Sequence, residues 1–268
     1  MNAETTKLHW KKAAGSYDTR ITSDLDDPKL RKAWMKILTE GVPDGDGLQI
    51  LDVGTGPGFF SVLLSEAGHH VTGIDCTEDM IRKARKNAEY WHADANYLVM
   101  DAEHPDFPDN TFDVIVSRNV TWTLLDPFHT YREWRRILKP GGRLLIFDGN
   151  WYWNLFDRDT FEEMERRTDR YMEMYGEFPA HFSMNVITDY MRGLPLVGVR
   201  RPDWDRATLW KLDYSRIRAR WITDEETERS EDDRMLYGAV PMFMILADKP
   251  AKERNSAERP MYLWEMEA

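Results

Sequence analysis

The sequence predicts an α/β protein built on a doubly wound, mostly parallel sheet. Short apolar runs alternate with helical patterns between residues 46 and 150, and a glycine-rich turn directly follows the first run. After residue 150 the alternation stops and longer helical patterns replace it. Strand–helix alternation of this kind requires right-handed crossovers, which make neighbouring strands parallel.

Five apolar runs are predicted as buried strands because each is short and bounded by turn residues. They cover residues 48–53, 70–75, 96–101, 111–118 and 143–148. Helical patterns lie between most of them, at 58–68, 77–91 and 126–138. The last helix begins with the capping pair Asp126-Pro127, and Lys139-Pro140-Gly141-Gly142 ends it.

The remaining parts are predicted as additions to this core within a single domain. Residues 1–45 are polar and helical and form an N-terminal helical lid, while 46–150 form the core. The other parts are a helical insertion or cap at 151–212, a final strand pair at 213–249 and a tail at 250–268. Within the strand pair, strands at 215–222 and 241–248 flank the acidic run 224–233, which we expect to be a solvated loop.

The insertion is predicted to open with a long helix. Thr160 and Glu163 match a capping box, and Gly176 is placed to end the helix. The apolar stripe of this helix consists of Phe161, Met164, Tyr171, Met172 and Tyr175. Further helices are expected at 183–193 and 205–212.

Composition limits the classes of partner. The formal net charge is -11, which disfavours nucleic acid, and the adjacent Arg200 and Arg201 are assigned to a solvated surface. Cys76 is the only cysteine, so no disulfide forms within the chain. The seven histidines show no metal-ligand spacing. Because no apolar run resembles a signal peptide or a membrane span, a cytoplasmic protein without a membrane partner is expected.

The segment from Asp52 to Gly58 carries the strongest functional signal. Its glycines permit a tight turn and let a ligand lie against bare backbone, and the following helix directs free N–H groups at that ligand. Asp75 ends the second strand, 21 residues after Gly54, where an acid can bind ribose hydroxyls. Phe59 replaces the third glycine of a dinucleotide fingerprint, which disfavours a nicotinamide-dependent oxidoreductase.

Four segments together resemble the class I S-adenosylmethionine-dependent methyltransferases, in the small-molecule, type 11-like group. They are LDVGTGPG at 51–58, GID at 73–75, MDAEHPDFPDNTFDVIVSRNVTW at 100–122 and LKPGGRLLIFD at 138–148. The resemblance implies a Rossmann-like sheet of seven strands, closed by an antiparallel hairpin. It also implies S-adenosylmethionine as methyl donor and S-adenosylhomocysteine as product.

The resemblance assigns roles to individual residues. The methionine moiety would lie against Asp52, Gly54, Thr55, Gly56 and Gly58, and Asp75 would bind the ribose. Cys76 and Met80 would touch the adenine face, and Asp101 and Ala102 its edge. Arg118 and Asn119 would border the sulfonium, with Tyr17 and Trp10 over the cofactor. The alternatives are an Asp52 that only caps the loop, an Arg118 paired with an acid, and plain packing for the two aromatics.

The methyl acceptor is expected beyond the fourth and fifth strands, at the carboxyl edge of the sheet. Substrate contacts are assigned to Trp122, Trp151, Trp153 and Phe182, with Asp148, Asn150 and Tyr152 nearby and Met172 and Tyr175 closing over them. Aromatic walls suit a planar or apolar acceptor, or a cationic amine, although core packing is the alternative. His181 is the candidate general base, which only an oxygen or nitrogen acceptor would need.

The leading hypothesis is therefore a small-molecule methyltransferase, with the homodimer as an open possibility. A protein methyltransferase is the second hypothesis. The third is a non-catalytic sensor of S-adenosylmethionine, in which the tail around Trp264 blocks the acceptor mouth.

Overall fold

The strands and helices follow the predicted alternation along the chain. The computed structural model describes residues 3–179 and 189–252. Its strands are β1 (Gln49–Val53), β2 (His70–Asp75), β3 (Ala95–Val99), β4 (Phe112–Arg118), β5 (Leu138–Gly149), β6 (Ser215–Ile222) and β7 (Met242–Asp248). Its helices are α1 (Ala3–Asp26), α2 (Pro28–Gly41), α3 (Phe59–Glu66), α4 (Glu78–Tyr90), α5 (Pro127–Ile137), α6 (Arg158–Tyr175), α7 (Asp189–Arg192), α8 (Asp203–Lys211) and α9 (Glu231–Tyr237).

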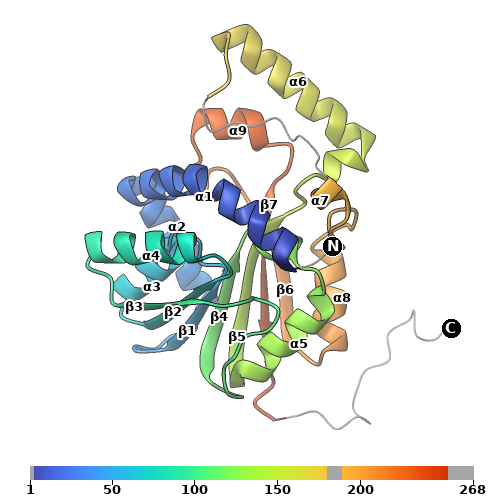
Figure 1. The fold of residues 1–268 in the computed structure, drawn as a ribbon. Coiled ribbons are helices and arrows are strands. Elements are labelled where there is room, and N and C mark those ends of the chain that lie inside the picture. The colour runs from blue at the N-terminus through green and yellow to red at the C-terminus, as the bar shows by residue number, and fades with distance from the viewer. Residues whose placement is uncertain (1–2, 180–188, 253–268) are drawn as a thin grey trace, which may run out of the picture.

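The strands form one seven-stranded sheet in the order β3-β2-β1-β4-β5-β7-β6 (Figure 1). Neighbours from β3 to β5 pair in parallel, whereas β7 pairs antiparallel with both β5 and β6. The predicted doubly wound sheet with a closing hairpin is therefore confirmed. Such an arrangement places ligands at the carboxyl edge of the parallel strands.

The two faces of the sheet bury separate apolar cores, because successive strand residues point to opposite faces. Ile50 packs on the face covered by α2 and α3, with Trp34 and Phe60 among its neighbours in the core. Leu51 packs on the other face, against α5 and α8. Figure 1 shows these two helix layers on either side of the strands.

The start of β5 differs from the prediction. Lys139-Pro140-Gly141-Gly142 does follow the end of α5, but these residues belong to the strand as a bulge. Leu138 pairs with Phe112, and the next pair is Arg143 with Val114. The extra residues are accommodated because Gly141 adopts a positive φ of 82°.

The long helix α6 begins and packs differently from the prediction. Asp157, and not Thr160, is its N-cap, since the Asp157 carboxylate accepts the backbone N–H of Thr160 at 3.0 Å. Gly176 ends the helix as predicted. The predicted apolar stripe is buried at Tyr171 but exposed at Phe161 and Tyr175. The reason is that α6 stands away from the sheet and packs mainly against α9 and the 3₁₀ turn before it.

The acidic run at 224–233 is only partly the solvated loop that was predicted. Its last three residues form the first turn of α9, where Ser230 caps the helix by accepting the backbone N–H of Asp233. Acidic residues are favourable there because they face the positive end of the helix dipole. The helix predicted at 183–193 is observed as α7 at 189–192, and its earlier residues lie outside the described ranges.

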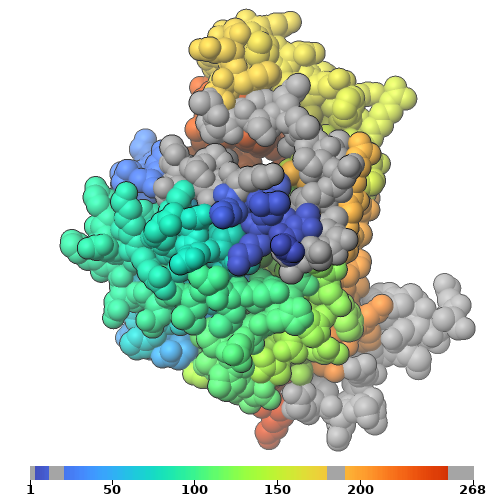
Figure 2. All heavy atoms as spheres, viewed as in Figure 1, coloured from blue at the N-terminus to red at the C-terminus, as the bar shows by residue number. Residues whose placement is uncertain are grey.

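Helix α1 crosses over the top of the sheet in the view of Figure 1, with α9 and α6 beyond it. In the space-filling view of Figure 2, the blue atoms of its first turns lie against the green body of the molecule. Ile21 and Leu25, near its end, are buried in the first core. Helix α1 therefore covers the edge of the sheet at which the parallel strands end, whereas α2 covers one face of the sheet.

Candidate functional site

A cavity of about 1130 Å³ lies at the carboxyl edge of the sheet. Its lining includes the glycine loop, the ends of β2 and β4, the start of α1 and residues between 227 and 242. Many predicted site residues meet there, although they come from separate parts of the chain. These are Asp52, Gly54, Thr55, Gly56, Asp75, Cys76, Met80, Asp101, Ala102, Arg118, Asn119, Trp122 and Trp151.

The glycine loop presents bare backbone to this cavity. Gly54, Gly56 and Gly58 all have positive φ angles, of 65°, 52° and 93°. A Cβ at Gly54 would overlap Val120, whereas a Cβ at Gly56 would meet no atom within 4 Å. Gly58 does not line the cavity and is the N-cap of α3, whose first N–H groups are thus directed toward the loop. The loop therefore has an open side at Gly56 and a closed side at Gly54.

Asp52 is hydrogen-bonded to both the glycine loop and helix α3. Its Oδ2 accepts hydrogen bonds from Oγ1 of Thr55 at 2.6 Å and from Oγ of Ser61 at 2.7 Å. Burial raises the pKa of Asp52, and these two hydroxyls only partly oppose the rise. Its hydrogen-bond partners are these hydroxyl groups and the backbone of Ser61. The carboxylate connects the loop to α3.

Asp75 lies beside the open side of the loop. Its Oδ2 accepts the backbone N–H of Gly56 at 3.2 Å, and its Oδ1 accepts the N–H and Oγ1 of Thr77 at 2.9 and 3.0 Å. Burial raises the pKa of Asp75 against these hydrogen bonds. The neighbouring Cys76 stays a thiol, because burial and then the charges of Asp75 and Asp101 raise its pKa to about 12.

Asp101 and Ala102 lie at the next turn along the same edge. Asp101 accepts the backbone N–H of Glu103 at 3.0 Å and contacts Nδ1 of His104 at 3.2 Å. The carbonyl of Ala102 accepts Nε1 of Trp134 at 2.9 Å, which ties this turn to α5. Asp101 thus caps a turn and also lines the cavity.

Arg118 and Asn119 close the end of β4. The Arg118 guanidinium lies 4.5 Å from the ring centre of Trp34 and forms an ion pair with Asp24 at 3.8 Å. The sequence-based alternative of an acid partner for Arg118 is therefore observed, with the acid supplied by α1. Asn119 adopts a positive φ of 59°, and its buried Oδ1 has no hydrogen-bond partner within the described ranges.

An aromatic wall continues the cavity beyond Asn119. It consists of Trp10, Trp122, Trp151 and Tyr152, and we call these four residues the aromatic wall. The ring centres of Trp10 and Trp122 are 6.2 Å apart, and those of Trp122 and Tyr152 are 5.5 Å apart. Trp10 reaches the wall from α1, so the lid and the core both contribute to it.

Other predicted acceptor contacts are not brought to the cavity. Trp153 does not line it and instead contacts Phe156, with ring centres 6.4 Å apart. Met172 and Tyr175 are exposed on α6. His181, Phe182 and the side chain of Tyr17 lie outside what the structure describes, so their roles stay predictions.

The structure also contains site residues that the sequence analysis missed. Arg201, assigned to a solvated surface, is in fact buried with 1% of its surface exposed, because two carboxylates surround it. The sequence contained one signal for this ion pair: Asp205 follows Arg201 by four residues, at the start of a predicted helix. Arg229, Leu236 and Tyr237 also line the cavity, and Arg229 lies in the acidic run that was predicted as a solvated loop.

Two properties follow from the described part of the chain. Among residues 3–179 and 189–252, no group of three or more His, Cys, Asp or Glu side chains could hold a metal ion. None of the helices observed there has the length and apolar character needed to cross a membrane.

Comparison with known proteins adds independent findings. Residues 51–146 match the model of the family described as "Methyltransferase domain". The chain is 34% identical over 147 residues to malonyl-[acyl-carrier protein] O-methyltransferase of Erwinia pyrifoliae, covering 54% of this chain and 52% of that protein. It is also 34% identical over 143 residues to the ubiquinone/menaquinone biosynthesis C-methyltransferase of a Ruegeria species, covering 50% and 55%. The chain thus spans about half the length of these curated relatives.

A solved structure resembles the whole fold. It is a methyltransferase bound to the Trm112 activator of Haloferax volcanii, with a TM-score of 0.59 at 19% identity, covering 90% of this chain and 97% of that one. This similarity extends the shared fold beyond residues 51–146, to the sheet and helices on either side of that segment.

Proposed function

Because the chain belongs, through residues 51–146, to the class I S-adenosylmethionine-dependent methyltransferases, we propose that it transfers a methyl group from S-adenosylmethionine to a small-molecule acceptor. One observation supports this most strongly. The open glycine loop and the half-buried carboxylate of Asp75 share a single cavity with the aromatic wall. A donor and an acceptor would therefore meet in one cavity.

The residues present fit the donor. Gly56 leaves its side of the loop open, so a ligand can approach the backbone there. Asp75 offers a carboxylate for the ribose hydroxyls, and the Oδ1 of Asn119 is a buried acceptor without a hydrogen bond from any residue in 3–179 or 189–252. Cys76, Met80, Asp101 and Ala102 would hold the adenine, as the family resemblance implies.

When bound, S-adenosylmethionine supplies a methyl group on a positively charged sulfur, which an acceptor displaces in line to leave a neutral thioether. The chain contributes alignment and exclusion of water. Helix α1 covers the cavity and brings Trp10 to its aromatic wall. The neutral thioether leaves without a proton, so no general acid is needed. A general base serves an acceptor that must lose a proton, such as an oxygen or nitrogen acceptor. His181 remains our candidate for that role.

The size and lining of the cavity favour a flat or apolar acceptor. Its volume of about 1130 Å³ exceeds the upper end of the range for one ligand, roughly 1,000 Å³, which leaves space for a second molecule. The aromatic wall offers ring faces and edges at the acceptor end. Such surfaces bind planar rings by stacking, and amines through cation–π contacts.

Calorimetry followed by a turnover screen tests the proposal. The full chain is titrated with S-adenosylmethionine, S-adenosylhomocysteine and NAD, and we expect low-micromolar binding of the first two and none of NAD. Thiols, amines, phenols and quinones are then screened for formation of S-adenosylhomocysteine. Binding without turnover on any of them, or on protein substrates, would favour the sensor hypothesis. Binding of NAD alone would contradict the proposal.

A further inference from the structure

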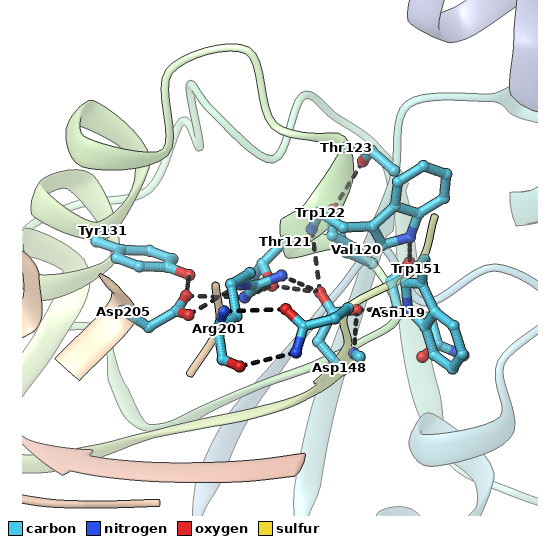
Figure 3. Close-up of polar contacts among 12 residues, drawn as sticks. Asn119, Val120, Thr121, Trp122, Thr123, Tyr131, Asp148, Trp151, Arg201 and Asp205 are labelled. Carbon is cyan, nitrogen blue, oxygen red and sulfur yellow. Dashed lines mark hydrogen bonds and ion pairs between the residues drawn. The ribbon is translucent and has the colours of Figure 1, made fainter. Parts of the chain in front are cut away.

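A buried polar cluster lies directly behind the aromatic wall (Figure 3). Its centre is Asp148, at the end of β5, which is 0% exposed. One carboxylate oxygen, Oδ1, accepts Nε1 of Trp151 at 2.7 Å and the backbone N–H of Gly149 at 2.8 Å. The other, Oδ2, accepts the backbone N–H of Trp122 at 3.0 Å and the hydroxyl of Thr121. Asp148 therefore holds two tryptophans of the aromatic wall.

Arg201 connects this carboxylate to α8. Its Nη1 donates to Asp148 Oδ2 at 3.1 Å, while Nε and Nη2 each donate to one oxygen of Asp205 at 2.8 Å. Nη2 also donates to Oγ1 of Thr121 at 2.6 Å. Tyr131 completes the cluster from α5, since its hydroxyl donates to Asp205 at 2.6 Å. The planar guanidinium thus bridges two carboxylates and a hydroxyl at once.

The backbone of Arg201 is held as firmly as its side chain. Asn150 accepts the N–H of Arg201 at 2.9 Å and donates to its carbonyl at 2.8 Å. This reciprocal pair joins the segment before α8 to the turn that carries Trp151. Figure 3 shows Arg201 between Asp205 and Asp148, with Trp122 and Trp151 on the far side of Asp148.

The members of this cluster stand behind the cavity surface. The lining of the cavity includes Trp122 and Trp151 but not Asp148, Arg201 or Asp205. Burying an ion pair is a poor means of gaining stability, because desolvation offsets the attraction and apolar replacements often do as well. An apolar replacement, however, cannot orient hydrogen-bond donors. The charged cluster orients the indole N–H of Trp151 and the backbone N–H of Trp122.

We propose that Arg201 is a positioning residue for the acceptor end of the cavity. By holding the Asp148 carboxylate, it fixes the Trp122 turn and the Trp151 indole in the wall that the acceptor contacts. The identity of that end as an acceptor site rests on the proposed function. The position of the Trp151 indole does not, so it can be measured without any substrate.

The test uses nuclear magnetic resonance of the ¹⁵N-labelled full chain. The indole N–H resonance of Trp151 is assigned by its absence in Trp151→Phe. In Arg201→Met we expect this resonance to shift and its hydrogen exchange to accelerate about tenfold or more, as a charge-assisted hydrogen bond loosens. Arg201→Lys should restore little of the wild-type resonance position or exchange rate, because one ammonium group cannot replace the several N–H donors of the planar guanidinium. Should Arg201→Met fail to fold, Asp148→Asn tests the same hydrogen bond.

Arg143→Met is the matched control. Arg143, on β5, also pairs with a buried carboxylate, donating from Nε to Asp248 of β7 at 2.7 Å, but it lies away from the end of β5 that carries Asp148. The control should lose an ion pair and leave the Trp151 resonance unchanged. An unaltered Trp151 resonance in a folded Arg201 or Asp148 variant, or an equal change in the control, would overturn the proposal.

Steady-state kinetics distinguishes a positioning role of Arg201 from a general loss of structure. With an acceptor found in the turnover screen, Arg201→Lys should raise the acceptor KM at least about fivefold, while the Kd for S-adenosylhomocysteine stays within about twofold. A rise in the Kd for S-adenosylhomocysteine as large as the rise in the acceptor KM would contradict the proposal. If the screen finds no acceptor, the proposed function is in doubt, whereas the resonance of Trp151 still decides the role of Arg201.

Discussion

Replacement of Asp75 by alanine is the sharpest test of the proposed donor site. In the structure its carboxylate accepts hydrogen bonds from Gly56 and Thr77 and lines the cavity beside the open side of the glycine loop. Ribose hydroxyls would be further donors to the same oxygens. Losing this acceptor should weaken binding of S-adenosylhomocysteine by about 1–3 kcal/mol, or roughly 5- to 150-fold in Kd.

The same substitution also affects stability, so a matched variant is needed. Asp75→Ala leaves the backbone N–H groups of Gly56 and Thr77 without their acceptor, which costs about 1–3 kcal/mol when water cannot reach them. Thr77→Ala removes the hydroxyl that caps α4, at a cost of about 0.5–2 kcal/mol in the free energy of unfolding. It leaves the Asp75 carboxylate in place. Calorimetry should therefore show a large loss of affinity for Asp75→Ala and a change within about twofold for Thr77→Ala.

The pH dependence of S-adenosylhomocysteine binding is a second test of the role of the Asp75 carboxylate. Burial raises the pKa of Asp75 above 3.8, and ribose hydroxyls would donate more strongly to its ionised form than to the protonated acid. Affinity for S-adenosylhomocysteine should be full above the raised pKa and fall as the pH drops through it. Asp75→Asn should bind weakly across that interval, without the pH dependence. Equal affinities for the wild type and Asp75→Ala, or a wild-type affinity that stays constant down to pH 3.8, would refute the ribose assignment.

Three further predictions concern the loop, the thiol and the sheet. Gly56→Ala and Gly68→Ala both place a Cβ at positive φ with no atom within 4 Å, so each should cost about 1–2 kcal/mol in stability. Calorimetry should show lost S-adenosylhomocysteine binding only for Gly56→Ala, because only Gly56 lines the cavity. Alkylation of Cys76 by iodoacetamide should still accelerate above pH 10, since its pKa is about 12, and a plateau near pH 9 would contradict this. Burial is the largest single influence on the pKa of Asp113 and raises it, but the hydrogen bonds from Lys139 and the backbone of Gln49, together with the charge of Lys139, outweigh burial and leave that pKa below 3.8. Asp113 should therefore stabilise the fold above pH 3.8 and lose this effect as the pH falls through its lowered pKa, which urea unfolding of Asp113→Asn against wild type would measure.

Most of the sheet could be predicted because its signals are local. A parallel strand buried on both faces is a continuous apolar run, and the turn that follows β1 must contain glycine wherever φ is positive. Gly54, Gly56 and Gly58 all meet that requirement. Asp75 could be placed for the same reason, since the end of a strand and the start of a helix are both readable within a few residues.

The parts that the sequence did not predict depend on contacts between distant residues. Arg201 looks like a surface residue because Arg200 precedes it, yet its partner Asp148 lies on another element, 53 residues earlier in the chain. Tyr171 and Phe161 belong to the same predicted stripe, but one is buried and the other is exposed, because α6 packs on one side only. Periodicity shows which residues share a helix face, and it does not show whether anything covers that face.

The turn after β4 links the two ends of the cavity physically. Val120 occupies the space that a side chain at Gly54 would need, and the adjacent Thr121 is held by Asp148 and Arg201. Trp122 then continues directly into the aromatic wall. A side chain at Gly54 would therefore displace a turn that the buried cluster holds in place, and this constraint exists without any ligand. For this reason packing alone excludes a side chain at Gly54, whereas Gly56 faces open space, and beyond its positive φ only the proposed ligand would exclude a side chain there.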